Sequence, residues 1–185
     1  MNLLGHLLAL AILAPVASAG PGQAAGTASA DDERALLRTS ASIHEEHQEI
    51  HAALERATRE PGELGATARE LAGLLDPHFR REEEIATPPL SLLVPLAQGA
   101  ATPQMRAVIP LTQALERELP GMLEQHRRIG AARERFEAAA QRAQRPEYVR
   151  LSETLAHHAR QEEEVLYPAA ILVGRYVKAT VGRKP

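Results

Sequence analysis

Two histidine–glutamate pairs in this 185-residue chain share the same spacing and the same neighbours. His78–Pro88 reads HFRREEEIATP, His158–Pro168 reads HARQEEEVLYP, and six of the eleven positions are identical. Residues four apart lie on one face of a helix about one turn apart, so each segment presents an imidazole beside a carboxylate. Both groups are ligands of divalent and trivalent metal ions. The duplicated pair therefore favours a metal site over two unrelated surface ion pairs.

A second pair of segments repeats at nearly the same offset. Glu45–Ala57 reads EEHQEIHAALERA, Glu124–Phe136 reads EQHRRIGAARERF, and seven of the thirteen positions match, including His47 with His126. The second half of the chain is thus a copy of the first: a helix with one histidine, then a helix with His-x3-Glu. Two such hairpins pack face to face, so the repeated polar groups meet near a common axis. Buried there, they need cations to compensate them.

Four helices must position these residues. Apolar periodicity, caps and stop signals predict helices over about 31–59, 63–84, 104–143 and 147–173, with a short apolar helix or loop at 90–96. Prolines 77, 110, 120 and 168 are expected to kink or interrupt these helices. No segment indicates a strand, and the connections are short. We predict an all-α, up-and-down four-helix bundle over residues 31–185, with a pseudo-twofold internal repeat.

The N-terminus has the pattern of an export signal. Residues 3–16 are almost wholly apolar, and Ala17-Ser18-Ala19 forms an A-x-A cleavage site, although no Lys or Arg precedes the apolar run. We therefore predict a signal peptide over 1–19, a small polar leader over 20–30 and a periplasmic or secreted protein. The apolar run is too short for a membrane span, so no stable membrane insertion is expected.

Composition narrows the class of partner. The net charge is −3, which does not favour nucleic acid or anionic lipid. The chain has no cysteine, so disulfides and iron–sulfur clusters are excluded. Aromatic residues make up only 3% of the chain, and the acidic runs at 82–84 and 162–164 favour cations as partners.

The ordered motifs together resemble the hemerythrin family, and the bacterial HHE cation-binding branch in particular. The order is a histidine, then His-x3-Glu, then a histidine, then His-x3-Glu, and the resemblance covers about residues 31–173. It implies two non-haem iron ions held by five histidines and two bridging carboxylates. Carried over to this chain, the ligands are His47, His51, His78, His126 and His158, with Glu82 and Glu162 as bridges.

One departure from the family pattern shapes the expected ligand set. The family usually places its paired histidines on the third helix, whereas here His47 and His51 lie on the first, and the repeat aligns His51 with Gly130. We expect a swapped asymmetry in which one iron is coordinatively full and the other has an open position beside Gly130. The full iron takes His47, His51 and His78, and the open one takes His126 and His158.

Other polar residues near the motifs have plainer interpretations. His44 and His157 stay open as outer or competing ligands. The remaining glutamates of the two acidic runs, 83–84 and 163–164, are interpreted as a solvated flank of ion pairs. Tyr167 is interpreted as a packing or hydrogen-bonding residue.

The resemblance implies reversible binding of O2, or of a similar diatomic or peroxide ligand, for carriage, storage, sensing or scavenging. An aromatic-poor aliphatic core and the absence of a recognisable acid–base pair favour a binding protein. Two alternatives stay open. One is a di-iron enzyme acting on peroxide, NO or a small substrate, and the other is a metal-buffering protein.

Overall fold

The computed structural model describes residue 38 and residues 41–181. The predicted signal peptide and leader lie outside the described residues. The helices are α2 (Ala41–Thr58), α3 (Gly62–Ile85), η1 (Pro88–Leu92), α4 (Leu93–Ala97), η2 (Pro103–Ala107), α5 (Val108–Arg142), α6 (Pro146–Gln161), η3 (Glu162–Leu166) and α7 (Tyr167–Val181). No strand occurs among these residues. The predicted all-α class is confirmed.

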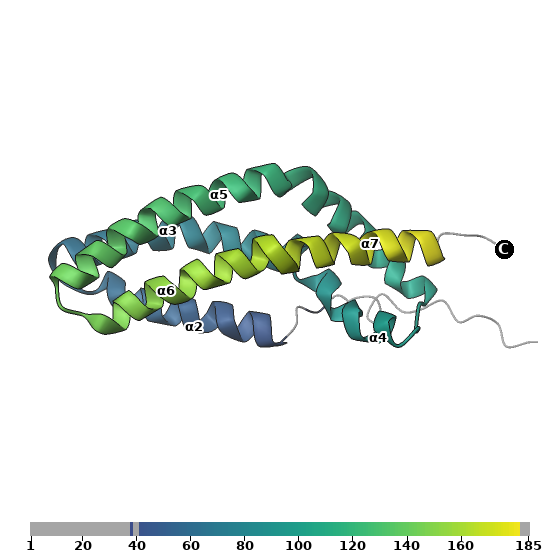
Figure 1. Ribbon diagram of the computed structural model, residues 1–185, viewed down its shortest axis with the longest axis horizontal. Helices are drawn as coiled ribbons and strands as arrows, with labels where there is room; N and C mark the ends of the chain where they lie inside the picture. Colours follow the sequence, from purple (N-terminus) through teal and green to yellow (C-terminus); the bar gives the residue numbers. More distant parts are fainter. Residues whose placement is uncertain (1–37, 39–40, 182–185) are drawn as a thin grey trace, which may run out of the picture.

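Two helical hairpins form the bundle, and Figure 1 shows how they lie side by side. The first hairpin is α2 with α3, and the second is α5 with the continuous rod of α6, η3 and α7. Helix α3 packs against both α2 and α5, α5 packs against α6, and α2 contacts α6, so the four helices close a ring. The short elements η1, α4 and η2 connect the hairpins at the end where α7 lies. This is the predicted up-and-down four-helix bundle.

Three of the four prolines expected to disturb helices lie within continuous ones. Helix α3 contains Pro77, and α5 contains Pro120. Pro110 lies in the first turn of α5, where a missing N–H removes no helical hydrogen bond. Helix α5 therefore runs uninterrupted over its 35 residues, which differs from the predicted break.

The fourth proline is accommodated by a π-helical turn. Pro168 has no N–H for the carbonyl of Glu164, four residues earlier. The preceding segment η3 is π-helical, and the backbone N–H of Tyr167 donates to the carbonyl of Glu162, five residues earlier. Such turns occur inside α-helices at functional sites. Here it carries the chain through Pro168 without ending the helix.

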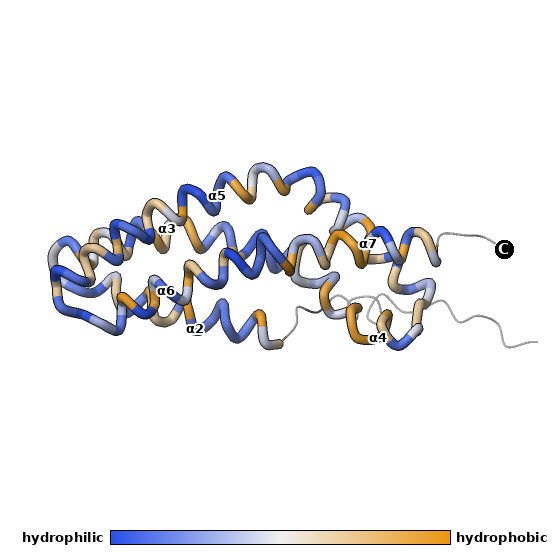
Figure 2. The backbone as a smooth tube through the Cα atoms, in the orientation of Figure 1, coloured by the Kyte–Doolittle hydropathy of each residue, from blue (hydrophilic) through white to orange (hydrophobic). Residues whose placement is uncertain are grey.

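Apolar side chains form separate cores above and below the middle of the bundle. One cluster fills the end where each hairpin turns and includes Leu71, Phe79 and Phe136. Another lies beyond the bundle centre and includes Leu115 and Tyr167. A third joins α7 to the connecting elements. Figure 2 shows several stretches of hydrophobic residues in and around α4 and α7 at this end.

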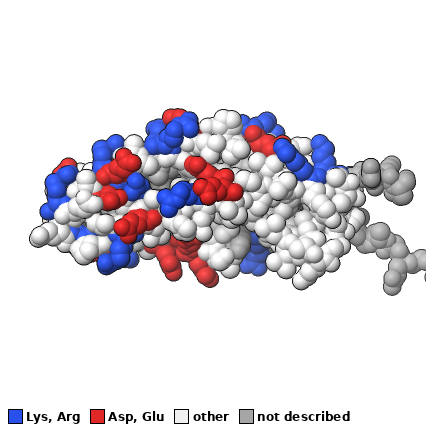
Figure 3. Space-filling model, in the orientation of Figure 1, with Lys and Arg blue, Asp and Glu red and all other residues white. Residues whose placement is uncertain are grey.

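The described helices include none with the length and apolar character that crossing a membrane requires. Charged side chains are frequent over the hairpin-turn half of the surface in Figure 3, whereas the visible face around α4 and α7 carries few.

Candidate metal centre

Six of the seven predicted ligand residues meet in the middle of the bundle, between the first two apolar cores. All six are buried, and they come from α2, α3, α5, α6 and η3 as His47, His78, Glu82, His126, His158 and Glu162. Their ligand atoms form two groups, and within each group every atom lies within 4.8 Å of the others. We name these groups the first and the second metal position.

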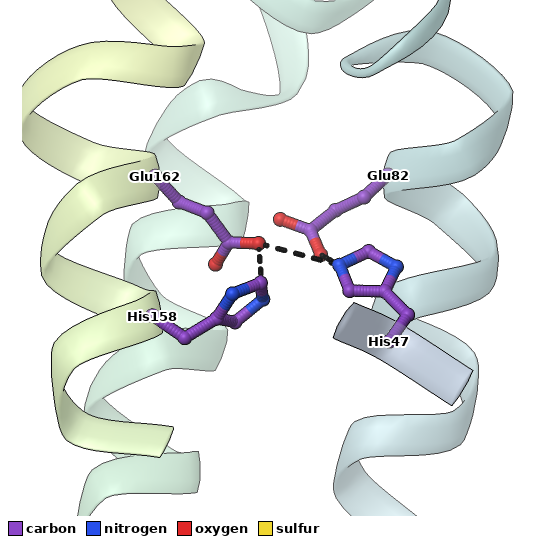
Figure 4. A group of neighbouring side chains, drawn as sticks. All are labelled: His47, Glu82, His158 and Glu162. Carbon is purple, nitrogen blue, oxygen red and sulfur yellow. Dashed lines mark ion pairs between the residues drawn. The ribbon is translucent and has the colours of Figure 1, made fainter. Parts of the chain in front are cut away.

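The first metal position lies between His47 and His158. Nε2 of His158 is 2.8 Å from Oε1 of Glu162, and Nε2 of His47 is 3.7 Å from the same oxygen. Nε2 of His47 also lies 3.9 Å from Oε2 of Glu82. Figure 4 shows the four side chains pointing toward one another from their helices. Two imidazole nitrogens and two carboxylate oxygens thus surround one point.

The second metal position lies between His78 and His126. Their Nε2 atoms are 2.8 Å apart. Nε2 of His78 is 3.4 Å from Oε1 of Glu82, and Nε2 of His126 is 3.3 Å from Oε2 of Glu162. Each carboxylate therefore gives one oxygen to each position. That is the arrangement of two carboxylates bridging a pair of cations.

The opposite nitrogen of each ring is held from outside the centre. Nδ1 of His47 lies 3.2 Å from Oε1 of Glu83, and Nδ1 of His126 lies 2.7 Å from Oε1 of Glu163. The other two follow the same plan: Nδ1 of His78 is 3.0 Å from Oε1 of Gln125, and Nδ1 of His158 is 3.3 Å from Oε1 of Glu46.

These outer contacts fix the tautomer of the imidazoles. Carboxylate and amide oxygens accept hydrogen bonds, so the Nδ1–H groups of His47, His78 and His126 donate outward, and Nδ1 of His158 faces the charge of Glu46. Each Nε2 then turns a bare lone pair toward the centre, which is how metal-binding histidines are oriented in proteins. The Nε2 atoms of His78 and His126 lie at hydrogen-bond distance, so either a proton or a metal ion must separate their lone pairs.

Within the described part of the chain, three buried side-chain atoms have no hydrogen-bond partner, and all belong to the first position. They are Nε2 of His47, Nε2 of His158 and Oε2 of Glu82. A buried polar atom without a partner is costly. A cation at this point would contact all three atoms, so the residues present fit a metal ion.

The electrostatics of the centre also call for positive charge. Burial and the neighbouring Glu162 raise the pKa of Glu82. Burial opposes ionisation of Glu162, but the neighbouring imidazoles of His126, His158 and His47 together hold the pKa of Glu162 well below its ordinary value. Among the ion pairs of the described residues, both carboxylates pair with histidines alone.

Two of the histidines are shifted toward the charged form in the absence of a metal. Burial lowers the pKa of His158, but the close contact with the negative charge of Glu162 outweighs it and raises the pKa to about 9. Burial also opposes protonation of His78, yet Glu82 and Gln125 raise its pKa. Protons therefore act as partial substitutes for the cations.

Tyr167 is a further part of the centre. Its ring is buried, its hydroxyl donates to Oε1 of Glu82, and Oη lies 3.2 Å from Nε2 of His126. The prediction of packing or a hydrogen bond is met on both counts, since the ring also stacks on His126. Burial and the nearby carboxylates raise the pKa of Tyr167, so its phenol is neutral without a metal.

The structure does not bring His51 to the centre. Its side chain is 56% exposed, and its Nε2 lies 3.2 Å from Oδ1 of Asp76. The buried stripe of α2 passes through His47, Ile50 and Leu54, which turns His51 toward the edge of the bundle. We therefore leave His51 out of the ligand set, and the swapped asymmetry built on it falls away.

The pairing of the histidines also differs from the predicted one. His47 was expected with His78, and His126 with His158. In the structure each position joins the two hairpins instead, with His47 opposite His158 and His78 opposite His126. The physical reason is that α2 contacts α6 and α3 contacts α5, so each interior space is shared between hairpins.

Glu83 and Glu163 are partly exposed and form ion pairs, as interpreted, and their partners are the imidazoles of His47 and His126. Glu46 and Gln125 likewise contact imidazoles and were not singled out. The signal was in the repeat, since these positions align with one another at offsets of 80 and 79. His44 lies outside the groups, with its Nδ1 3.0 Å from Oε1 of Glu83.

Comparison with known proteins gives one match. Residues 38–170 match a family described as the hemerythrin HHE cation binding domain. The match covers more than half of the chain and includes every residue of the two metal positions. No curated protein and no solved structure matches the chain.

Proposed function

The chain belongs to the hemerythrin HHE cation-binding domain family, and we propose that its buried centre holds two iron ions and reversibly binds O2 or a similar small ligand. The family match and the buried His/Glu cluster fit a metal site. The identity of the metal, the number of ions and the small ligand are our proposal.

The observation that carries the proposal is the direction of the four imidazoles. Each Nδ1 is held by an outer side chain, so each Nε2 faces two carboxylates inside the bundle. Without a cation this arrangement buries unpartnered atoms and brings two nitrogen atoms to 2.8 Å. A mixed set of imidazoles and carboxylates suits iron, whereas magnesium and calcium prefer oxygen alone.

Iron at the centre supplies the redox chemistry that small-ligand binding requires. The chain's own residues supply the rest. Glu82 and Glu162 bridge the two positions, the outer residues orient the rings, and the apolar cores on either side limit the access of water. Stable cycling of the centre depends on that exclusion.

The first experiment is metal analysis of purified residues 20–185 after anaerobic loading with Fe(II). Two irons per chain are expected, followed by a visible absorption change that appears with O2 and reverses when O2 is removed. Loose stoichiometry and equal uptake of several metals would support metal buffering instead. Turnover of added peroxide or NO would support the enzyme.

Two alanine variants on one helix provide a matched test of the ligand set. His47→Ala removes a buried imidazole of the first position, and His51→Ala removes an exposed imidazole one turn away. We expect His47→Ala to lose iron and His51→Ala to keep two ions. If His51→Ala lost iron and His47→Ala kept it, the proposed ligand set would be wrong.

We also propose that the protein is exported. The support is the apolar run and the A-x-A site described above, which lie outside the described residues. N-terminal sequencing of the protein from its native host is expected to start at Gly20. An intact Met1 in the cytoplasmic fraction would contradict export.

A further inference from the structure

We propose that Tyr167 is a fifth protein ligand, bound through Oη at the second metal position, so that a small ligand from outside binds at the first. This proposal rests on the proposed function, because it requires the centre to hold metal. It concerns a residue that lies outside the His-x3-Glu repeat pairs.

The distances place Oη among the donors of the second position. A metal with ligands at about 2.1 Å has neighbouring donors about 3 Å apart when they stand at right angles. Oη of Tyr167 is 3.2 Å from Nε2 of His126 and is hydrogen-bonded to Oε1 of Glu82. Both of those atoms belong to the second position. Oη therefore lies where one more vertex of the same coordination shell would be.

Binding through Oη balances in atoms and charge. A metal–oxygen bond forms, the phenol O–H bond breaks, and the proton leaves to solvent, with no change in oxidation state. The hydrogen bond to Glu82 is given up at the same time, which frees Oε1 of Glu82 for the cation. The phenolate adds one negative charge beside the two carboxylates, which favours a trivalent ion at this position.

Among the described residues, no tyrosine occupies the equivalent place at the first position. The repeat aligns Tyr167 with Thr87, and the ring that lies over His47 belongs to Phe79, at a centroid distance of 4.2 Å. A phenylalanine ring cannot coordinate. All three unpartnered buried atoms of the centre belong to this position. A surface pocket of about 200 Å³ lies against the outer side of His47, which it shares with Phe79 and Glu83.

Two phenylalanine variants test the proposal. Tyr167→Phe removes Oη at the centre, whereas Tyr148→Phe removes a buried hydroxyl that is bonded to Glu60, away from the centre. The chains are loaded with Fe(II) and oxidised to Fe(III). Wild type is expected to show a visible phenolate-to-iron band with phenolate vibrations in resonance Raman. Tyr167→Phe should lose both signals and keep two irons, and Tyr148→Phe should keep both signals.

A titration with azide gives the second readout. Wild type is expected to bind one azide per centre, at the first position, and Tyr167→Phe is expected to bind two because the second position opens. Wild type with two irons but without phenolate vibrations, or with two azides bound, would overturn the proposal for Tyr167 alone. A chain that takes up no iron would overturn the proposed function and this proposal with it.

Discussion

The two His-x3-Glu helices place the same types of side chain at the centre but differ in how the chain continues after the motif. In the first copy, the N–H groups of Ala86 and Thr87 both donate to the carbonyl of Glu82, and α3 ends. In the second copy, the N–H of Tyr167 donates to the carbonyl of Glu162, and the helix continues into α7. A proline follows in both, at 88 and 168.

The comparison shows which parts of the repeat are constrained. Both copies contain the ligands, the outer partners and a backbone hydrogen bond to the carbonyl five residues earlier, just before the proline. We attribute this to the need of each metal position for the same set of side chains. The residue just before the proline differs between the copies: it is Thr87 in the first and Tyr167 in the second. The two halves of the centre are therefore equivalent in their carboxylates, Glu82 and Glu162, and differ in the residue before the proline.

The largest expected effect comes from the bridges. Glu82→Gln and Glu162→Gln each replace a carboxylate that faces both positions with a neutral amide, which keeps only one oxygen ligand and no negative charge, so we expect either variant to lose both metals. A cation at a thousand times its Kd stabilises the fold by about 4 kcal/mol, and that metal-dependent gain should vanish. Metal analysis and denaturant unfolding with and without iron measure this, with Glu84→Gln, an exposed neighbour, as control. Loss in only one of the two variants would show that the copies are not equivalent.

The next effect concerns α7, which has no counterpart in the first copy. A methyl group at Gly174 would overlap Thr112 of α5, so Gly174→Ala should destabilise the fold by about 2–3 kcal/mol. At Gly73 a methyl group meets nothing within 4 Å, so Gly73→Ala should stabilise α3 by about 0.5–1 kcal/mol. Thermal unfolding compares the two. Equal melting temperatures would contradict the close packing of α7 on α5.

A smaller effect is expected from the outer partners. Glu83 and Glu163 occupy equivalent places behind His47 and His126, so Glu83→Gln and Glu163→Gln should each weaken metal binding by about 10–100-fold. Competition against a chelator gives the affinities. Glu164→Gln, an exposed change beside Glu163, should leave affinity unchanged. If the metal affinities of Glu83→Gln and Glu163→Gln differed widely, the two copies would be equivalent in their ligands but not in their outer partners.

The smallest effect is a pH dependence of the metal-free protein. Glu162 raises the pKa of His158 to about 9 in the fold from an ordinary value of 6.5. The resulting stabilisation is fully present below about pH 6.5 and is lost as the pH rises through 9. Denaturant unfolding of chelator-treated wild type and His158→Gln across this range checks it. A wild-type stability that rose with pH and matched that of His158→Gln would contradict the assigned shift.

The sequence allowed the fold and most of the centre to be predicted. The repeat identified four histidines and two glutamates, since duplication of a polar set inside amphipathic helices indicates a shared interior. The predicted helix over about 104–143 agrees with α5, but no interruption occurs at Pro110, which falls in the first turn, where proline fits. Such a position depends on where a helix begins, which local signals leave uncertain by several residues.

His51 shows why residue spacing alone could not predict the complete ligand set. A residue four positions after His47 lies about 40° further around the helix, and the narrow interior stripe runs through Ile50 instead. The pairing of histidines across hairpins depends on which helices are neighbours, and a repeat does not specify that. Tyr167 lies inside the aligned segment, but the repeat pairs it with Thr87, so the repeat alone could not identify it as part of the centre.

The cores on either side of the centre do not form a single apolar cluster. The layer between them is polar, and its groups face one another rather than water. With cations bound, that layer joins the two ends of the bundle into one cooperative unit. Without them the layer keeps buried polar atoms that have no partner, so we expect local opening to start there. Metal supply would then determine how often the chain is exposed to proteases, independently of any ligand that the centre binds.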